Sequence, residues 1–348
     1  ALDIILAGKA IDASKAFRIG LVDALLPDAS FLHLVRDFAG AVAAGRAPER
    51  RHATLRSRLL EASSLGRGGE FSQARPRVLA KTGGHYPAPL RAIEVVEQAV
   101  SRGLEAGLEA EARATGELAV SPVSKNLVHV FHLVEAVKHQ ALAAVPSPVS
   151  AVGVIGAGIM GGGISQLVAD RAEIPVRLKD LASEPLASGL AHAAKLFDKQ
   201  VARRRLTPVE AKRKMGLIRP TLGYSGFLHL DLVIEAIVER LDSKQKVFVD
   251  LAACVADDTI LASNTSSLSI DAIAQTTPGP DRVVGMHFFN PVHRMPLVEI
   301  IKGEATSDRT LSTVIDFVRR LGKTPIVVGN GPGFLVNRLL GFYMIEAL

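Results

Sequence analysis

The sequence predicts an α/β fold in which a mainly parallel β-sheet is covered by helices on both faces. Short β-rich stretches alternate with longer segments of helical periodicity over residues 149–331. The β-rich stretches are continuously apolar, as in strands that are buried on both faces of a sheet. A Pro-Ser linker, "AVPSPVS" at 144–150, marks an abrupt change from the preceding text. We therefore expect a separate α/β domain after this linker.

The strands and helices of this domain can be placed in order. "TPVE" at 207–210 has the spacing of a capping box with proline at the first helical position, so a helix should begin there. Other helices should end near Asp170, begin near Leu186 and begin at Gly333. The predicted strands are "AVGVI", "IPVRLKD", "LDLVIEAI", "TILAS", "RVVGMHFF", "LVEII" and "TPIVVG".

The first 145 residues are predicted to be mostly helical. Residues 1–45 alternate short apolar runs with turn signals, and residues 46–90 are basic, with breaks expected at "LGRGGEF" and "TGGHYPAPL". Two helical segments should follow between residues 90 and 142, separated near "AVSPVS". The chain opens without methionine and closes within a helical pattern, so we expect a fragment of a longer protein.

Composition excludes several classes of protein. A hydrophobic fraction of 48% and a charged fraction of 22% are ordinary for a globular protein, and no stretch has the length of a membrane helix. Cys254 is the single cysteine, which excludes an intrachain disulfide. It fits a reducing compartment such as the cytoplasm, where we expect the protein, although one cysteine is also compatible with other compartments. The net charge of +6 is explained by scattered Lys and Arg, which we interpret mainly as a solvated surface. The "RRR" segment at 203–205 could approach coenzyme A phosphates, but a solvated face is the preferred interpretation. His129, His132 and Glu135 are better explained by an amphipathic helix than by a metal site, and no metal is expected.

A glycine-rich turn predicts a Rossmann-like dinucleotide site. Gly156, Gly158 and Gly161 have G-x-G-x-x-G spacing between a strand and a helix, and Asp180 ends the next strand. The first glycine permits a tight turn, the second allows a pyrophosphate to approach, and the third allows close helix–strand packing. The helix N-terminus offers N–H groups to the phosphates, and an acid at position 180 favours NAD over NADP.

Two ionisable residues in apolar runs predict the reacting end of the site. His287 lies in "GMHFF" and Glu299 in "LVEII", at the ends of consecutive strands, so the two side chains can meet. Imidazole is suited to accept a proton from a hydroxyl while hydride leaves to a nicotinamide, and a carboxylate can hold it in one tautomer. Asn264 and Ser266 follow another strand end, where ligands of open α/β sheets bind, although turn and cap chemistry would also explain them.

Six motifs in order resemble the 3-hydroxyacyl-CoA dehydrogenase family. They cover residues 149–348 and read "GAGIMGGGI", "VIEAIVE", "LASNTSSLSI", "GMHFFNPVHRMPLVEII", "GKTPIVV" and "PGFLVNRLL". The fourth motif and "AKTGGHYPAP" resemble the α subunits of bacterial fatty-acid oxidation multienzymes. The N-terminal "ILAGKAIDASKAFRIGLVDALLP" is similar to the last part of a crotonase-like enoyl-CoA hydratase/isomerase domain.

The resemblance implies roles for individual residues. It makes His287 the catalytic base, Glu299 its partner, Ser266 a contact of the substrate hydroxyl and the nicotinamide end, and Asn337 part of the polar set around the reacting carbon. For the cofactor it implies the set Gly156, Gly158, Ile159, Met160, Gly161, Asp180, Ala236, Glu239, Lys244, Ser266 and Asn290. The implied reaction is the reversible, NAD-dependent oxidation of an (S)-3-hydroxyacyl-CoA to the 3-ketoacyl-CoA in fatty-acid β-oxidation.

The resemblance also implies domains and partners. We expect the end of a crotonase-like domain plus a linker helix at 1–145, the NAD-binding domain at 149–331, and the first helix of a helical domain at 332–348. In crotonase-like hydratases the acid–base residues lie upstream of the segment that this sequence resembles, so we expect the hydratase active site to be absent. The full-length protein is expected to bind acyl-CoA, to form a homodimer and to pair with a thiolase β subunit, without nucleic acid or an integral membrane segment. Two alternatives stay open, namely a related 3-hydroxy acid dehydrogenase and an NAD-binding, catalytically impaired fragment with an assembly role.

Overall fold

The computed structural model describes residues 2–8, 10–46 and 64–346. Contacts between Cα atoms divide the chain into two compact units, Ala1–Phe131 and His132–Leu348. The division falls within helix α8 (Pro122–Lys138). The predicted boundary at the Pro-Ser linker stays a prediction.

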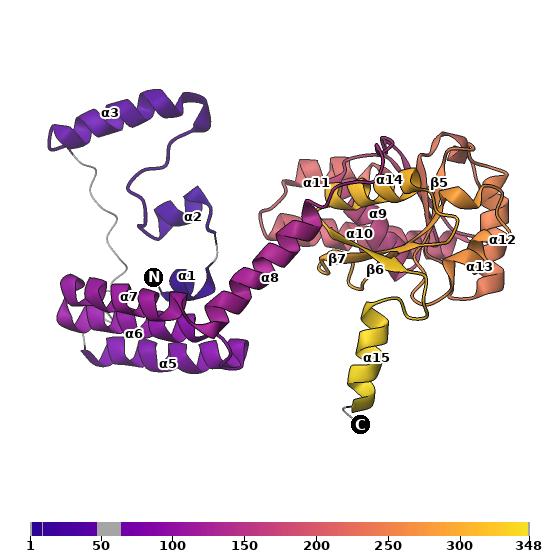
Figure 1. Cartoon of the computed structure of the whole chain (residues 1–348). Coiled ribbons are helices and arrows are strands. Elements are labelled where there is room, and N and C mark those ends of the chain that lie inside the picture. Colours follow the sequence, from indigo (N-terminus) through magenta and orange to yellow (C-terminus); the bar gives the residue numbers. More distant parts are fainter. Residues whose placement is uncertain (1, 9, 47–63, 347–348) are drawn as a thin grey trace. The chain divides into compact units, whose positions relative to one another are not determined.

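The first unit is helical in its described residues (Figure 1). Its helices are α1 (Leu2–Ala7), α2 (Ala13–Arg18), α3 (Phe31–Ala43), α5 (Ser64–Thr82), α6 (Pro87–Arg102) and α7 (Leu104–Ala119), followed by α8. The expected break at "LGRGGEF" is wrong, because these residues lie inside α5. Two helices were expected between residues 90 and 142, but this region contains three, α6, α7 and α8. The additional break is at Gly103, whose φ of +97° separates α6 from α7.

The second unit contains an eight-stranded sheet in the order β3-β2-β1-β4-β5-β6-β7-β8. All neighbouring strands are parallel except the antiparallel pair β6–β7. The strands are β1 (Val152–Ile155), β2 (Val176–Lys179), β3 (Ile218–Thr221), β4 (Leu232–Glu235), β5 (Ile260–Ser263), β6 (Val283–Phe288), β7 (Leu297–Lys302) and β8 (Thr324–Gly329). The prediction of a mainly parallel, Rossmann-like sheet is confirmed.

Helices cover both faces of this sheet, as predicted. One core packs α9 (Ile159–Arg171), α10 (Ser183–Ala202), α11 (Pro208–Met215) and α14 (Asp308–Arg320) on one face. The other core packs α12 (Leu241–Ala252) and α13 (Ile270–Ala274) on the opposite face (Figure 1). Because successive strand residues point to opposite faces, Glu235, Ser263, His287 and Glu299 all belong to the α12–α13 face.

Local predictions had mixed outcomes in this unit. The capping box is confirmed, since the Thr207 side chain accepts from Glu210 N while the Glu210 carboxylate accepts from Thr207 N. Strand β3 was missed because "IRPT" carries two residues that are unusual in buried strands, and it occupies the edge of the sheet. The last helix, α15, spans Val336–Glu346 and so begins three residues later than expected. None of the helices in the described part is long and apolar enough to cross a membrane.

Candidate active site

The antiparallel pairing of β6 and β7 places His287 directly opposite Glu299. The imidazole Nδ1 lies 2.7 Å from the Glu299 Oε2 atom. Both residues are buried, with exposed fractions of 5% for His287 and 0% for Glu299. The sequence had placed them at the ends of consecutive strands, whereas they face each other as cross-strand neighbours. A buried carboxylate in this position accepts the Nδ1 hydrogen and leaves Nε2 as the nitrogen that a ligand can use.

The second oxygen of Glu299 is held by the chain that leads into α15. Its Oε1 accepts hydrogen bonds from Leu335 N at 3.0 Å and from Val336 N at 2.8 Å. Phe334 is buried, has a φ of +51°, and its ring centroid lies 5.9 Å from that of His287. The ring of Phe289 lies nearer, at 4.5 Å. The imidazole therefore has a polar partner on one nitrogen and aromatic rings around it.

Two other predicted residues meet at the start of α15. The Asn337 Nδ2 atom donates to the backbone oxygen of Ser266 at 3.3 Å. The Ser266 side chain is exposed. Asn264, two residues earlier, accepts from Phe288 N at 2.8 Å, which ties this loop to the residue that follows His287. The loop after β5 is thus joined to both strand β6 and helix α15.

The glycine turn has the geometry of a dinucleotide site. Gly156 adopts a φ of +95°, and a Cβ there would lie 2.5 Å from the Ala236 oxygen. A Cβ on Gly161 would overlap the Gly156 oxygen, whereas a Cβ on Gly158 would have nothing within 4 Å. Gly158 caps α9 without a side-chain hydrogen bond, and the first N–H groups of the helix, those of Ile159, Met160 and Gly161, have no acceptor within the helix. An anion can approach here, and these residues fit a pyrophosphate.

Asp180 follows β2 and faces the same turn. Its Oδ2 accepts from Ala157 N at 2.7 Å, and its Oδ1 accepts from Leu181 N at 2.7 Å. Each carboxylate oxygen retains a free lone pair for ribose hydroxyls. Ala236, on the neighbouring strand end, donates its N–H to Ile155 O at 2.7 Å. Asn290 is exposed, and its peptide bond to Pro291 is cis.

Lys244 and Glu239 form a charged cluster with a residue that the sequence reasoning missed. Lys244, only 1% exposed, lies with its Nζ 2.7 Å from Glu235 Oε1 and 3.2 Å from Glu239 Oε2. Glu239 Oε1 also accepts from Thr265 Oγ1 at 2.6 Å and from Ser266 N at 2.7 Å. Burial raises the pKa of Glu239, but these two hydrogen bonds and the charge of Lys244 outweigh it, so the net pKa lies below its usual value. The signal for Glu235 was the same as for His287, an ionisable residue in an apolar strand.

Sheet register relates the glycine turn to the histidine. Ile155, which precedes Gly156, pairs with Glu235, which pairs with Ser263, which pairs with Gly285. His287 lies two residues beyond Gly285 on the same strand. The glycine turn, the polar loop after β5 and the imidazole therefore belong to one edge of one sheet.

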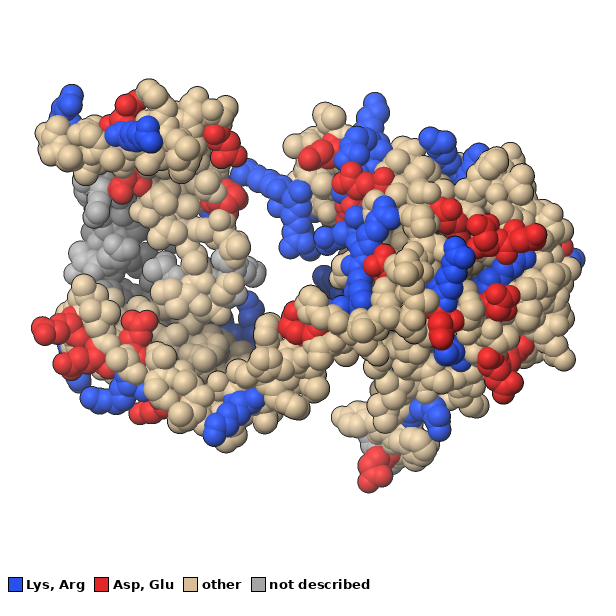
Figure 2. Space-filling model, turned by 45° about the horizontal axis from the view of Figure 1, so that its top comes forward, with Lys and Arg blue, Asp and Glu red and all other residues tan. Residues whose placement is uncertain are grey.

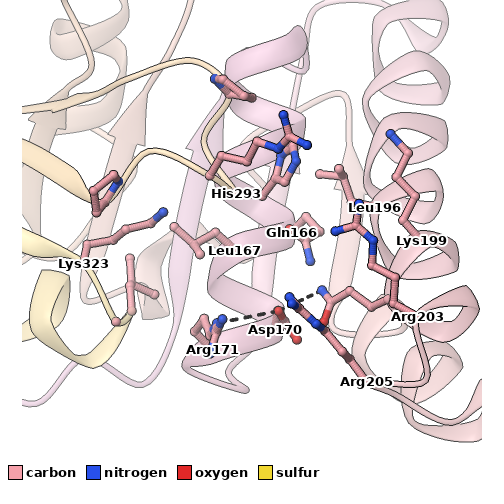
Figure 3. A pocket seen from close by; sticks show the side chains of 16 residues that line it. Gln166, Leu167, Asp170, Arg171, Leu196, Lys199, Arg203, Arg205, His293 and Lys323 are labelled. Atoms are coloured by element: carbon pink, nitrogen blue, oxygen red, sulfur yellow. Dashed lines mark hydrogen bonds and ion pairs between the residues drawn. The ribbon is translucent and has the colours of Figure 1, made fainter. Parts of the chain in front are cut away.

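A pocket of about 430 Å³ lies between α9, α10 and the loop that joins β6 to β7 (Figure 3). Its six lysine and arginine side chains face one acid, Asp170; they are Arg171, Lys199, Arg203, Arg205, Arg294 and Lys323. Burial and then the charges of Arg294 and Lys199 lower the pKa of His293, which also lines the pocket. Figure 2 shows Lys and Arg side chains gathered on the part of this unit that carries α10 and α11. The pocket is suited to a polyanion.

Comparison with known proteins agrees with this geometry. Residues 151–331 match the family described as "3-hydroxyacyl-CoA dehydrogenase, NAD binding domain". The chain is 41% identical over 99% of its length to the fatty acid oxidation complex subunit alpha of Vibrio parahaemolyticus, and 42% identical over its full length to that of Shewanella putrefaciens. It spans 49% of the length of each of these relatives.

Solved structures give a similar result for the α/β unit. The (S)-3-hydroxybutyryl-CoA dehydrogenase of Ralstonia eutropha is 40% identical, with a TM-score of 0.56 over 57% of this chain and 70% of that one. The 3-hydroxybutyryl-CoA dehydrogenase of Escherichia coli is 37% identical, with a TM-score of 0.56 over 58% of this chain and 42% of that one.

Proposed function

Since the chain belongs to the 3-hydroxyacyl-CoA dehydrogenase family, we propose that it oxidises (S)-3-hydroxyacyl-CoA to 3-ketoacyl-CoA with NAD, as a step of fatty-acid β-oxidation. The observation that carries this proposal is the buried pair of His287 and Glu299 on the sheet edge that also bears the glycine turn. A hydroxyl oxidation needs one group that accepts the proton of the hydroxyl oxygen and a second that accepts hydride from the carbon that bears this oxygen.

His287 is the proton acceptor. Glu299 accepts the Nδ1 hydrogen, so the neutral imidazole presents the lone pair of Nε2 to the substrate hydroxyl. When the imidazole becomes a cation, the carboxylate at 2.7 Å stabilises it. Phe289 and Phe334 keep water away from the ring, which strengthens this interaction.

Ser266 and Asn337 orient the substrate oxygen. Their backbone and side-chain atoms already touch, through the hydrogen bond from Asn337 Nδ2 to Ser266 O. Side-chain hydroxyl and amide groups can donate to the substrate oxygen, which gains negative character as its proton moves to His287.

The dinucleotide site is built for NAD. When bound, NAD supplies the acceptor for hydride. The N–H groups at the start of α9 would hold its pyrophosphate next to Gly158, and Asp180 would accept from the adenine ribose while repelling a 2′-phosphate. Ala236, Glu239, Lys244, Ser266 and Asn290 would surround the nicotinamide end. Asp180 is therefore the reason to propose NAD rather than NADP.

The basic pocket supports an acyl-CoA over a free 3-hydroxy acid. Coenzyme A carries several phosphate charges, and the pocket brings six lysine and arginine side chains to the loop that follows strand β6. A free 3-hydroxy acid carries no phosphate groups for these side chains to bind. The "RRR" segment thus lies partly at this pocket rather than only on a solvated face, since Arg203 and Arg205 line it.

The names of the relatives support a proposal about partners. Curated relatives carry the name of a subunit of a fatty acid oxidation complex. We propose that the full-length protein pairs with a thiolase β subunit, forms a homodimer and works in the cytoplasm.

The alternative is an NAD-binding protein with an assembly role and little turnover. It is favoured by the exposed apolar side chains of α15, among which Phe342 and Tyr343 are 73% and 72% exposed. A surface of this kind is typical of an interface.

One experiment separates these functions. The protein is mixed with NADH and acetoacetyl-CoA or free acetoacetate, and NADH consumption is followed by absorbance, alongside His287→Ala. The proposal expects consumption with acetoacetyl-CoA that His287→Ala abolishes. Equal rates with the free acid would refute the CoA substrate, and NADH binding without consumption would favour the assembly role.

A further inference from the structure

We propose that Glu235 is a positioning residue that fixes, through Lys244 and Glu239, the loop carrying Ser266 at the nicotinamide end of the cofactor site. The inference rests on the proposed NAD-dependent function and adds a residue outside the cofactor set that the family resemblance implies. Glu235 does not need to touch the cofactor to have this effect.

Glu235 has an unusual position for a carboxylate. It is the last residue of β4, is 0% exposed, and pairs in register with Ile155 on one side and Ser263 on the other. Its Oε1 accepts from Lys244 Nζ and from Ile237 N, each at 2.7 Å, and its Oε2 accepts from Ser263 Oγ at 2.6 Å. A charge buried this deeply persists only because it is fully paired.

Lys244 carries the effect from the buried carboxylate to the cofactor side. Its ammonium group lies between Glu235, which is buried, and Glu239, whose side chain is 39% exposed. Because Glu235 supplies the shorter contact, it fixes where the ammonium lies, and the ammonium in turn attracts Glu239.

Glu239 carries the effect to the substrate loop. One of its oxygens accepts from Thr265 Oγ1 and Ser266 N, while the other faces Lys244. The position of the Glu239 carboxylate between Lys244 and the loop depends on how much of the Lys244 charge Glu235 neutralises. Without the carboxylate of Glu235, Glu239 becomes the only carboxylate at the ammonium and is drawn toward it, away from Thr265 and Ser266.

The competing explanation is that Glu235 and Lys244 form a buried ion pair that only stabilises the fold. This explanation predicts loss of stability with no specific change in cofactor affinity. The positioning role predicts that cofactor affinity falls even in folded protein, and that the fall depends on Lys244.

The test is a double-mutant cycle read by NADH fluorescence titration and by thermal unfolding. Glu235→Gln keeps the shape but removes the charge. Its amide oxygen can still accept from Lys244 and Ile237, while its NH2 group can donate to Ser263 Oγ. We expect it to raise the dissociation constant of NADH about tenfold, as for a broken buried charge pair that orients a ligand contact. Glu173→Gln is the control, because Glu173 pairs with Lys214 at 3.1 Å outside the site, and it should leave NADH affinity unchanged.

The second arm uses Lys244→Gln, alone and with Glu235→Gln. If Glu235 acts through Lys244, adding Glu235→Gln to Lys244→Gln changes NADH affinity less than about twofold. The double variant has no unpaired buried ammonium, so it folds even where Glu235→Gln alone does not. Unchanged NADH affinity in folded Glu235→Gln, or a further tenfold loss in the double variant, would overturn the inference. Absence of NADH binding by the unsubstituted protein would overturn the proposed function, and the inference with it.

Discussion

Replacing Glu299 by glutamine should disable the histidine without disturbing the cofactor. The two oxygens of Glu299 have different partners: Oε1 accepts from Leu335 N and Val336 N, and Oε2 faces His287 Nδ1. The glutamine amide has one acceptor oxygen and one donor NH2 group, so it can accept on one side only. Its two orientations therefore have different consequences.

The orientation of the amide follows from the number of donors on each side. Turning its NH2 group toward Leu335 and Val336 would break two backbone hydrogen bonds, at a cost of about 1 kcal/mol or more each. The NH2 group therefore faces His287, whose Nδ1 must then accept. The imidazole hydrogen moves to Nε2, and the ring can no longer take a proton from the substrate.

The magnitude follows from the loss of general acid–base catalysis, because the histidine that accepts the proton in the oxidation donates it in the reverse reduction. We expect kcat to fall about 10³-fold, equivalent to about 4 kcal/mol of transition-state stabilisation. NADH affinity should stay within about twofold, because Glu299 does not belong to the dinucleotide site. The assay is NADH consumption with acetoacetyl-CoA, with Glu304→Gln as a control at an exposed position. A kcat within tenfold of the unsubstituted protein would refute the reasoning, and so would an equal loss of NADH affinity.

Three further predictions concern the cofactor turn and the basic pocket. Gly161→Ala should lower Tm, because the added methyl overlaps the Gly156 oxygen, whereas Gly158→Ala should change stability by less than about 0.5 kcal/mol but weaken NADH binding. Unchanged NADH binding in both variants would contradict the proposed site. Arg203→Ser with Arg205→Ser should raise KM for acetoacetyl-CoA about tenfold and leave NADH affinity unchanged, and an unaltered KM would remove the pocket from the account. The lowered pKa of His293 means that its charge appears only below its usual value of 6.5, next to Arg294, Lys199, His192 and Lys323. Affinity for coenzyme A, measured by calorimetry, should therefore rise as pH falls below 6.5 and should lose this rise in His293→Ala.

The sequence contained enough information for the fold class, but less for the arrangement of the candidate site residues. The buried strand "VGVI" is continuously apolar and "LVIE" is apolar up to its final glutamate, so periodicity and length identify both. The eight-residue loop 289–296 between β6 and β7 is too short for the crossover that joins neighbouring parallel strands, so it favours an antiparallel pair. The prediction did not use this loop length, and His287 and Glu299 were therefore expected near each other but not in cross-strand register.

Other features depend on contacts between distant segments. Leu335 N and Val336 N donate hydrogen bonds to the Glu299 side chain, which lies 36 and 37 residues away in the sequence. No local sequence pattern predicts these two hydrogen bonds. The cluster of Glu235, Lys244 and Ser263 is similar, since three elements supply one residue each. Helix α5 was missed for a different reason, because packing against α6 outweighs the weak helix propensity of its glycines.

The most direct test of the account follows the hydrogen on the reacting carbon. The protein is incubated with NAD and (S)-3-hydroxybutyryl-CoA that carries deuterium at C3, and the NADH formed is examined by mass spectrometry. We expect the NADH to carry the deuterium, and we expect His287→Ala to form no labelled NADH although it still binds NAD. Unlabelled NADH, or labelled NADH formed at an unchanged rate by His287→Ala, would contradict the central claim. That claim is that the imidazole accepts the hydroxyl proton while the NAD bound at the glycine turn accepts hydride from the carbon of the same alcohol group.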